Sequence, residues 1–289
     1  MLYSLLIAPF VEFDFMRRAL IGLFALGLGA APVGVFLMLR RMSLTGDAVA
    51  HAILPGVAVG FALAGFSVVA MTVGGLIAGF IVVVVSGIAA RSTALNEDAT
   101  LAAFYLVSLA CGVMLVSARG SNVDLLHFLF GHVLALDDPS LLLIAMTNSL
   151  SLIVLALFYR PLVIDSVDPQ FLSTLSRAGG VAHLVFLAVV VITTVGAIQA
   201  LGTLLGVAAM ILPAVAARFW TRDVNTMVLT APLFGISANI VGLLVSYHAD
   251  SETGPAIVLT QGLAVFLSLM FGRAGGLVPR LLRPRHRVA

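Results

Sequence analysis

Long apolar runs follow one another along almost the whole chain, and they limit its fold more than any other feature. Residues Val68–Ala89, for example, contain no charged side chain. A helix needs about 20 such residues to cross the roughly 30 Å hydrocarbon core of a membrane. Only 10% of the 289 residues are charged, which leaves too little polar surface to cover a soluble globule of this size. The sequence therefore predicts an all-α polytopic membrane protein, with residues 1–289 in a single transmembrane domain.

Hydropathy and the positions of the interrupting charges predict about nine membrane crossings. The run from Val181 to Ala217 is nearly continuous and is broken only at residues 199–202, so eight crossings are an alternative. The second part of this run is short and contains Pro213, as expected for a half-helix that lines a cavity. The nine expected spans are Ala19–Leu39, Asp47–Phe66, Val68–Ala89, Thr100–Val116, Pro139–Phe158, Val181–Ala200, Thr203–Ala217, Val228–Tyr247 and Pro255–Phe271.

The arginines predict on which side of the membrane each connection lies. If Arg40 and Arg41 are cytoplasmic and the crossings alternate, 12 of the 15 basic residues lie inside, and every one of them is an arginine. Residues 273–289 then form a basic cytoplasmic tail, and the N-terminus lies outside. Residues 1–17 mix apolar and acidic side chains, which is typical of an interfacial segment rather than of a cleavable signal.

Asp47 and His51 are four residues apart at the start of the second expected span. Residues at this spacing share one face of a helix, so the carboxylate and the imidazole could bind one guest together. An ionisable group at the bilayer centre costs about 2.5–3.5 kcal/mol, and such groups normally face a partner or a water-filled path. Pro55 removes the hydrogen bond to the His51 carbonyl, so the helix is expected to kink beside Gly56. A metal or proton path is favoured, and capping or packing is the alternative.

The other histidines predict less. His127 and His132 are five residues apart, about 140° around a helix, and are expected to be interfacial or structural, with a metal entry route as the alternative. His248 and Asp250 belong to an acidic outer mouth that would attract cations, but solvated loop charges are the usual explanation for such residues. His183 is expected to cap a helix at the cytoplasmic side.

A long cytoplasmic connection, residues 160–180, is expected to contain a short amphipathic helix. Asp168 is a suitable N-cap, Pro169 suits the first helical position, and Gly179 or Gly180 would end the helix. Such a helix between two membrane spans indicates a surface for a soluble partner. The side chains expected on this surface are Phe171, Leu172, Leu175 and Arg177.

The sequence lacks the residues that several functions require. The chain has no lysine and no G-x-x-x-x-G-K-[ST] loop, so it does not hydrolyse ATP through a P-loop. Cys111 is the single cysteine, so one chain cannot form a cysteine metal cage, and Cys111 itself is expected to be a buried packing residue. No H-E-x-x-H motif occurs, so the chain lacks the usual residues of an intramembrane protease. No nucleic-acid partner is expected.

Four stretches resemble one known family. The run Arg40–Gly56, which reads RRMSLTGDAVAHAILPG, looks like the signature of the membrane subunit of ABC importers for zinc, manganese or ferrous iron. Residues Gly202–Ala217 are similar to the second apolar motif of that family. Leu129–Gly131 and the stretch that begins at Gly254 resemble further landmarks. The resemblance covers nearly the whole chain, and the first motif is the specific one.

This resemblance implies a type II importer permease in the cell membrane. It implies a homodimer with two cytoplasmic ATPase subunits and an extracytoplasmic metal-binding protein, no permanent cofactor, and Mn²⁺, Zn²⁺ or Fe²⁺ as the transported ion. Asp47 and His51 match the metal-contacting pair of the family, and Pro169–Arg177 would be the coupling helix. The chain departs from the family pattern at Asp165–Pro169, and it has no histidine-rich loop.

Two rival functions stay open from the sequence. An ABC permease for a metal chelate such as a siderophore or corrinoid would need a wider cavity without a paired ligand site. A proton-coupled secondary carrier would use Asp47 and His51 as a proton relay, and such carriers often contain inverted repeats, for which the sequence gives no clear sign.

Overall fold

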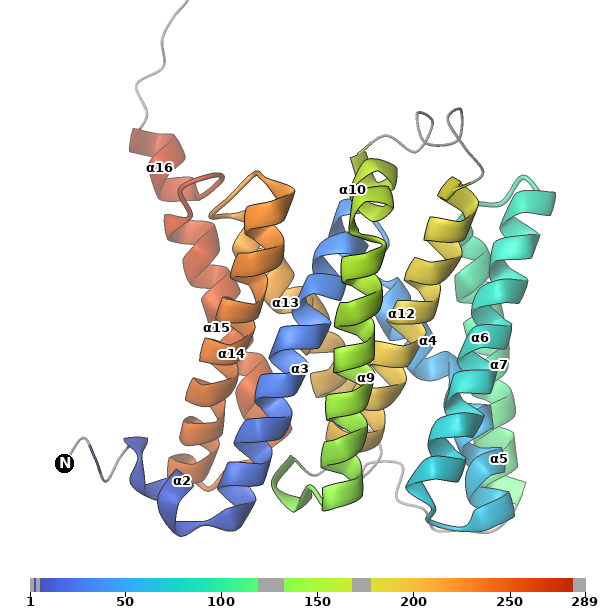
Figure 1. The fold of residues 1–289 in the computed structure, drawn as a ribbon, viewed down its shortest axis with the longest axis horizontal. Helices are drawn as coiled ribbons and strands as arrows, with labels where there is room; N and C mark the ends of the chain where they lie inside the picture. Colours follow the sequence, from blue (N-terminus) through green and yellow to red (C-terminus); the bar gives the residue numbers. More distant parts are fainter. Residues whose placement is uncertain (1–2, 4–5, 119–132, 168–177, 283–289) are drawn as a thin grey trace, which may run out of the picture.

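The computed structural model describes residues 3, 6–118, 133–167 and 178–282, and in these parts the chain is an all-helical bundle. Figure 1 shows the long helices side by side, with most connections at the two ends of the bundle. We refer to these ends as the α2 end, at the bottom of Figure 1, and the α10 end, at the top. The prediction of an all-α polytopic membrane protein is confirmed.

In the described part of the chain, eight helices are long and apolar enough to cross a membrane, counting α4 and α5 together as one span. A ninth apolar helix, α13, has 16 residues. The elements are α2 (Ala8–Glu12), α3 (Asp14–Leu39), α4 (Thr45–Ala52), α5 (Leu54–Ala64), α6 (Val68–Ser92), α7 (Glu97–Ala118), η1 (Val133–Ala135), α9 (Asp138–Leu157), α10 (Tyr159–Val167), α12 (Ala178–Leu201), α13 (Thr203–Arg218), α14 (Val224–Ala249), α15 (Thr253–Phe271) and α16 (Leu277–Leu282).

The short helix α13 returns the chain from one end of the bundle to the other. Gly202 separates it from α12 and has a φ of 87°, which a residue with a side chain rarely adopts. At its other end, the Phe219 carbonyl accepts a hydrogen bond from the Ala274 N–H, in the link between α15 and α16. With α13 as a crossing, α3 begins and α15 ends at opposite ends of the bundle, as Figure 1 shows.

Helix α3 is the central element, and most of its residues are buried. It packs against α9, α13 and α14. Small residues make these contacts possible, because a Cβ atom at Gly34 would collide with the Met210 carbonyl and one at Gly29 with Asn148. The close contacts fix the position of the Arg40 end of α3, from which the chain turns into α4.

The second span is interrupted. Helix α4 ends at Ala52, Ile53 forms a turn, and α5 begins at Leu54 with Pro55 in its first turn, a position that proline favours. The following glycines hold α5 against α6, since a Cβ atom on Gly56 would collide with the Gly74 carbonyl. The span is thus two short helices whose second member is fixed by backbone packing.

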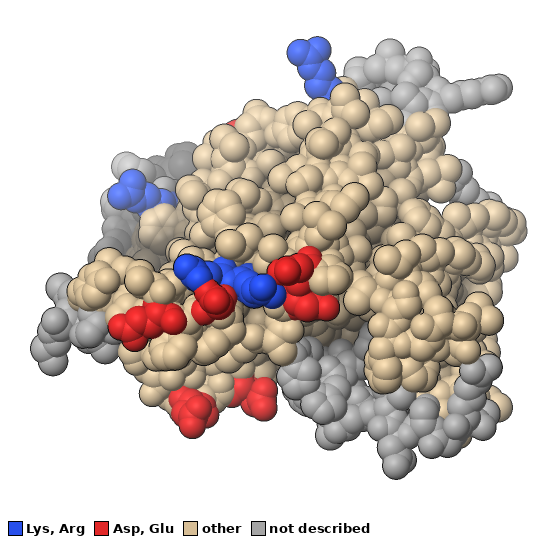
Figure 2. Space-filling view, turned by 60° about the horizontal axis from the view of Figure 1, so that its bottom comes forward, with Lys and Arg blue, Asp and Glu red and all other residues tan. Residues whose placement is uncertain are grey.

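The N-terminal segment forms α2 and then turns at Phe13 into α3. Helix α3 begins at Asp14, five residues before the expected start of the first span at Ala19. Figure 2 shows the α2 end with a small basic cluster surrounded by acidic side chains. Two ion pairs belong to this group, Arg17 with Asp14 and, at 3.0 Å, Arg18 with Asp138.

Candidate functional site

Asp47 and His51 lie on the same face of α4, as their spacing predicts. The Nε2 atom of His51 is 3.7 Å from the Oδ1 atom of Asp47. The side chain of Asp47 is 55% exposed and that of His51 is 28% exposed, whereas Ala48, Val49 and the other apolar residues of α4 are buried. The polar face of α4 is therefore the one that points away from the core of this chain.

Helix α7 supports the interrupted span from the other side. Three of its residues share one helical face, at positions i, i+3 and i+7. The ring of Tyr105 stacks on His51 with 6.3 Å between ring centroids, and the Ser108 hydroxyl donates to the Ala52 carbonyl at 2.8 Å. One turn further, a Cβ atom on Gly112 would lie 3.0 Å from the Pro55 nitrogen. No sequence signal marks this face, because Tyr, Ser and Gly at this spacing are common in packed helices.

A cavity of about 530 Å³ opens at the Asp47–His51 face. Its remaining lining comes from α13 and α15 and is apolar except for Thr203. A cation that entered this cavity would meet one carboxylate and one imidazole against an otherwise largely apolar wall. The lining residues other than Asp47 and His51 are Thr203, Leu204, Val207, Ala208, Ile211, Leu212 and Val258.

The His51 carbonyl, which loses its helical hydrogen bond at Pro55, lies where α4 ends. The Ile53 N–H at the end of α4 donates to the Val49 carbonyl at 3.2 Å. In the described residues, no group of three or more His, Cys, Asp or Glu side chains is arranged to hold a metal ion. One copy of the described chain therefore brings two side chains of metal-ligating type to this cavity, and a metal ion bound there would need further ligands from elsewhere.

The other expected site residues are distributed as follows. His248 is in the last turn of α14, with its ring 5.2 Å from that of Tyr247, and Asp250 caps the helix with a φ of 48°. Both lie at the α2 end and belong to no metal-binding group in the described part of the chain. His127, His132, Asp168, Pro169, Phe171, Leu172, Leu175 and Arg177 lie outside the described residues.

Two smaller expectations were wrong. His183 does not cap a helix, because it lies in the second turn of α12 and its Nε2 atom is 2.8 Å from the Glu97 carboxylate. Cys111 is exposed on α7 rather than buried. The partner of His183 is 86 positions away in the sequence, so no local pattern could have identified it.

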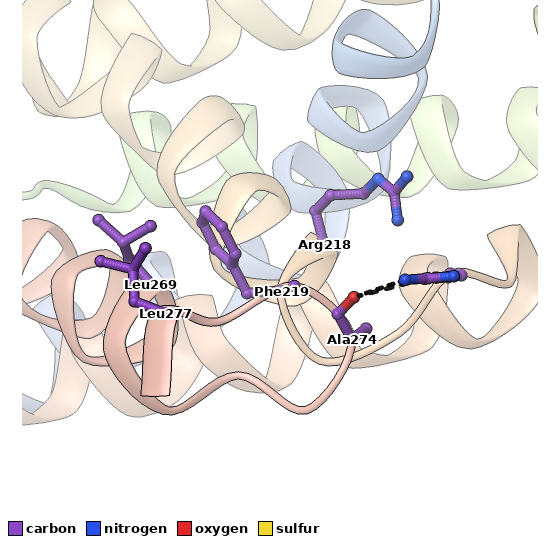
Figure 3. A pocket seen from close by; sticks show the side chains of 7 residues that line it. Arg218, Phe219, Leu269, Ala274 and Leu277 are labelled. Atoms are coloured by element: carbon purple, nitrogen blue, oxygen red, sulfur yellow. Dashed lines mark hydrogen bonds between the residues drawn. The ribbon is translucent and has the colours of Figure 1, made fainter. Parts of the chain in front are cut away.

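A second cavity of about 470 Å³ lies at the α10 end, between the α13–α14 link and the α15–α16 link. Figure 3 shows Arg218 and Phe219 on one side of it and Leu269 and Leu277 on the other. The Arg222 guanidinium donates to the Ala274 carbonyl at 3.2 and 3.3 Å, which holds the two links together. These contacts anchor the last helices at this end, away from Asp47.

Known proteins resemble this chain over almost its full length. The model of the ABC 3 transport family matches residues 12–272. The manganese import system permease protein ScaB of Streptococcus gordonii is 34% identical over 258 residues, covering 89% of this chain and 91% of ScaB. The chelated iron transport system membrane protein YfeD of Yersinia pestis is 28% identical over 284 residues, covering 98% of this chain and 94% of YfeD.

A solved structure agrees with the same assignment. A chain of PsaBC from Streptococcus pneumoniae in complex with Fab matches with a TM-score of 0.83 and 29% identity, covering 98% of this chain and 99% of that one. These relatives and the eight long apolar helices of the described residues show a multi-pass protein of the cell membrane. The resemblance found in the sequence is confirmed: the chain belongs to the ABC 3 transport family, the transmembrane permeases of ABC transporters.

Proposed function

We propose that this chain is the permease of an ATP-driven importer for divalent transition-metal ions, and that Asp47 and His51 bind the ion during its passage. The observation that carries the proposal is the pair itself: a carboxylate and an imidazole 3.7 Å apart on the outward face of a membrane helix, beside a cavity. Ionisable side chains within membrane spans normally mark a path for ions or protons.

The two ligands suit transport better than storage. Oxygen and nitrogen donors bind Mn²⁺, Fe²⁺ and Zn²⁺, whereas a closed set of four ligands would hold zinc as structural sites do. A second copy of the chain, related by a twofold axis at the open side of the cavity, would add its own Asp47 and His51. The permease is then a homodimer, and the partner copy shields from lipid the carboxylate that one chain leaves 55% exposed.

The interruption at Ile53 gives the site its ability to move. Ile53 separates α4, which carries the ligands, from α5, which begins with Leu54 and Pro55 and is packed closely on α6 at Gly56. A break of this kind allows α4 to tilt while α5 keeps its position. Alternating access to the pair would then need a small rotation of one short helix.

The remaining components follow from the orientation of the chain. We assign the α10 end to the cytoplasm, because the described arginines are concentrated there. Residues 168–177, in the link between α10 and α12, would receive one of two ATPase subunits. Those subunits hydrolyse ATP, since this chain has no lysine for a P-loop. An extracytoplasmic metal-binding protein would deliver the ion at the α2 end.

We take Mn²⁺ as the first ion to test. ScaB is a manganese import permease by name, whereas the name of YfeD refers to chelated iron. A chelate would cover the charge of its metal and would not need a carboxylate and an imidazole in the path. Competition with manganese uptake by free Zn²⁺ or Fe²⁺, but not by a ferric siderophore, is the expected result.

The test is uptake of radioactive manganese by cells that express the complete transporter. Asp47→Asn and His51→Ala remove one ligand each, and each is expected to lower uptake at least tenfold, which corresponds to about 1.4 kcal/mol. Glu12→Gln is the matched control, because it removes an exposed carboxylate from α2, outside the cavity. Wild-type uptake by both site variants at equal expression would refute the proposed site.

A further inference from the structure

Arg40 carries a buried guanidinium at the point where α3 ends. Its side chain is 6% exposed, and its Nη2 atom lies 2.7 Å from the carboxylate of Asp165, which is 14% exposed. The Nε atom donates to the Ser166 hydroxyl at 3.3 Å, and Nη1 is 3.5 Å from the Nδ1 atom of His183. The face of the guanidinium covers the ring of Phe186 at 4.4 Å from the ring centroid.

A second ion pair extends this group to another helix. The Nε2 atom of His183 is 2.8 Å from the Glu97 carboxylate, in the first turn of α7. The imidazole thus lies between Arg40 and Glu97. We call Arg40, Glu97, Asp165, Ser166 and His183 the Arg40 cluster; it joins the end of α3 to α7, α10 and α12.

The buried charges of the Arg40 cluster depend on one another. Burial lowers the pKa of the Arg40 guanidinium, and the charges of Asp165 and Glu97 oppose this effect. A buried charge that loses its partner is strongly destabilised, because no water replaces the lost interaction. When one member of the cluster moves, the others are therefore expected to move with it rather than separate.

The Arg40 cluster lies between the α10–α12 connection and the turn that leads into α4. Asp165 and Ser166 are in the last turn of α10, and His183 is in the second turn of α12, so the cluster includes both helices that flank residues 168–177. On its other side, Arg40 begins the five-residue turn that leads into α4. This turn is tight: Arg41 has a φ of 60°, and the Met42 N–H donates to the Leu37 carbonyl at 2.8 Å.

We propose that Arg40 is a positioning residue that couples the α10–α12 connection to the helix bearing Asp47 and His51. A displacement of α10 or α12 at the ATPase side moves Arg40, and the tight turn passes this movement to α4. This inference rests on the proposed function, because it assumes that the ATPase acts at the α10–α12 connection and that α4 carries the metal ligands.

The experiment measures coupling rather than transport alone. The complete transporter, with its ATPase subunits and binding protein, is reconstituted in liposomes, and manganese taken up and ATP hydrolysed are measured together. Arg40→Gln and Asp165→Asn each break the pair with little change in volume. Both variants are expected to keep ATP hydrolysis and manganese binding by the purified complex, and to lower the manganese transported per ATP at least tenfold.

Further variants separate positioning from a general loss of structure. Arg40→Lys keeps the charge but cannot contact Asp165, Ser166 and His183 together, so an intermediate ratio is expected. The double variant R40Q/D165N should be no worse than either single variant, because both remove one interaction. Arg41→Gln, at the neighbouring exposed arginine, is the matched control and should have the wild-type ratio.

The outcomes are distinguishable. A wild-type ratio of manganese to ATP in R40Q and D165N would overturn the coupling role, and so would a parallel loss of binding, hydrolysis and transport. If one variant does not assemble, the other decides the question. Asp47→Asn in the same liposomes tests the proposed function separately: normal transport by that variant refutes the metal site, whatever Arg40 does.

Discussion

At the scale of single residues, the exposure of Asp47 has the largest consequences. A carboxylate that faces hydrocarbon at the centre of a bilayer costs about 2.5–3.5 kcal/mol. Asp47 nevertheless points away from the core of its own chain, with His51 beside it. The cost is removed if the pair faces a hydrated path or the same face of a second copy. The orientation of one side chain thus supports both the path and the dimer of the proposed function.

Asp137 allows a stability prediction with a defined pH dependence. It caps α9, and its carboxylate accepts from the Ser140 N–H at 3.0 Å. Hydrogen bonding from Ser140 is the main cause that lowers the pKa of Asp137. A lowered folded-state pKa stabilises the helix above the unfolded value of about 3.9, and this contribution disappears as the pH falls through the folded value. Asp137→Ala is expected to cost about 1 kcal/mol at neutral pH.

Hydrogen exchange of the first turn of α9 measures this effect. At neutral pH, D137A should reduce amide protection there about fivefold, the equivalent of 1 kcal/mol. Once intrinsic rates are corrected, the difference between the two proteins should shrink as the pH falls below the unfolded value of about 3.9. Asp138→Ala is the matched control: the neighbouring carboxylate is 81% exposed and pairs with Arg18. Equal effects of the two substitutions would contradict the capping role.

The sequence predicted side-chain contacts within one helix but not those between different helices. Asp47 and His51 could be placed together because their spacing fixes their geometry. Arg40 and Asp165 are far apart in the sequence and meet only when α3 and α10 pack. His183 had the same difficulty, since a single histidine near a helix end gives no information about Glu97. Buried charge clusters are tertiary features, and single-residue patterns do not contain them.

At the scale of elements, the contact between α5 and α6 determines where the site helix can lie. Gly56 and Gly74 bring the two backbones together, each occupying the space that a Cβ atom on the other would need. Gly74→Ala is therefore expected to separate the helices and to cost about 1–3 kcal/mol, as overpacked contacts usually do. The melting temperature of the purified protein in detergent should fall.

The same helix supplies the control for this substitution. Gly87 is also in α6, and a Cβ atom there would have no neighbour within 4 Å. Gly87→Ala should leave the melting temperature unchanged or raise it, because alanine favours the helix by about 1 kcal/mol. If G74A melts at the wild-type temperature, the helices can move apart at little cost and the proposed fixed position of α5 is wrong.

The elements themselves were predictable to different degrees. The long spans followed from hydropathy, because each has enough apolar residues to cross the membrane. Proline at position 55 predicted a kink, whereas the structure has a complete break with a turn at Ile53. Helix α13 stayed ambiguous in the sequence, since 16 residues fit both a crossing and a half-helix. Its contacts at both ends resolve its course in the structure.

At the scale of the whole molecule, charge divides the two ends of the bundle. Arg40, Arg41, Arg160, Arg218, Arg222 and Arg273 lie at or next to helix ends at the α10 end. Acidic residues dominate the α2 end around Arg17 and Arg18, as Figure 2 shows. Basic residues are retained on the cytoplasmic side of membrane proteins, so this division predicts the orientation of the whole chain.

Cysteine labelling tests both this orientation and the crossing by α13. In a Cys111→Ser background, single cysteines are introduced at three exposed positions: Glu12→Cys in α2, Ala94→Cys in the α6–α7 link and Ser251→Cys in the α14–α15 link. With the α2 end outside and nine crossings, a membrane-impermeant maleimide should label positions 12 and 251 in intact cells. Position 94 should react only after permeabilisation.

Labelling at position 251 decides the number of crossings, because this position follows α13 in the chain. If α13 did not cross, Ser251 would share a side with Ala94, and both would be protected in intact cells. The reverse labelling of all three positions would instead invert the chain and move the α10–α12 connection outside, where no ATPase could reach it. Labelling of positions 12 and 251 alone is therefore required by the proposed transport direction, by the site for the ATPase and by the coupling role of Arg40.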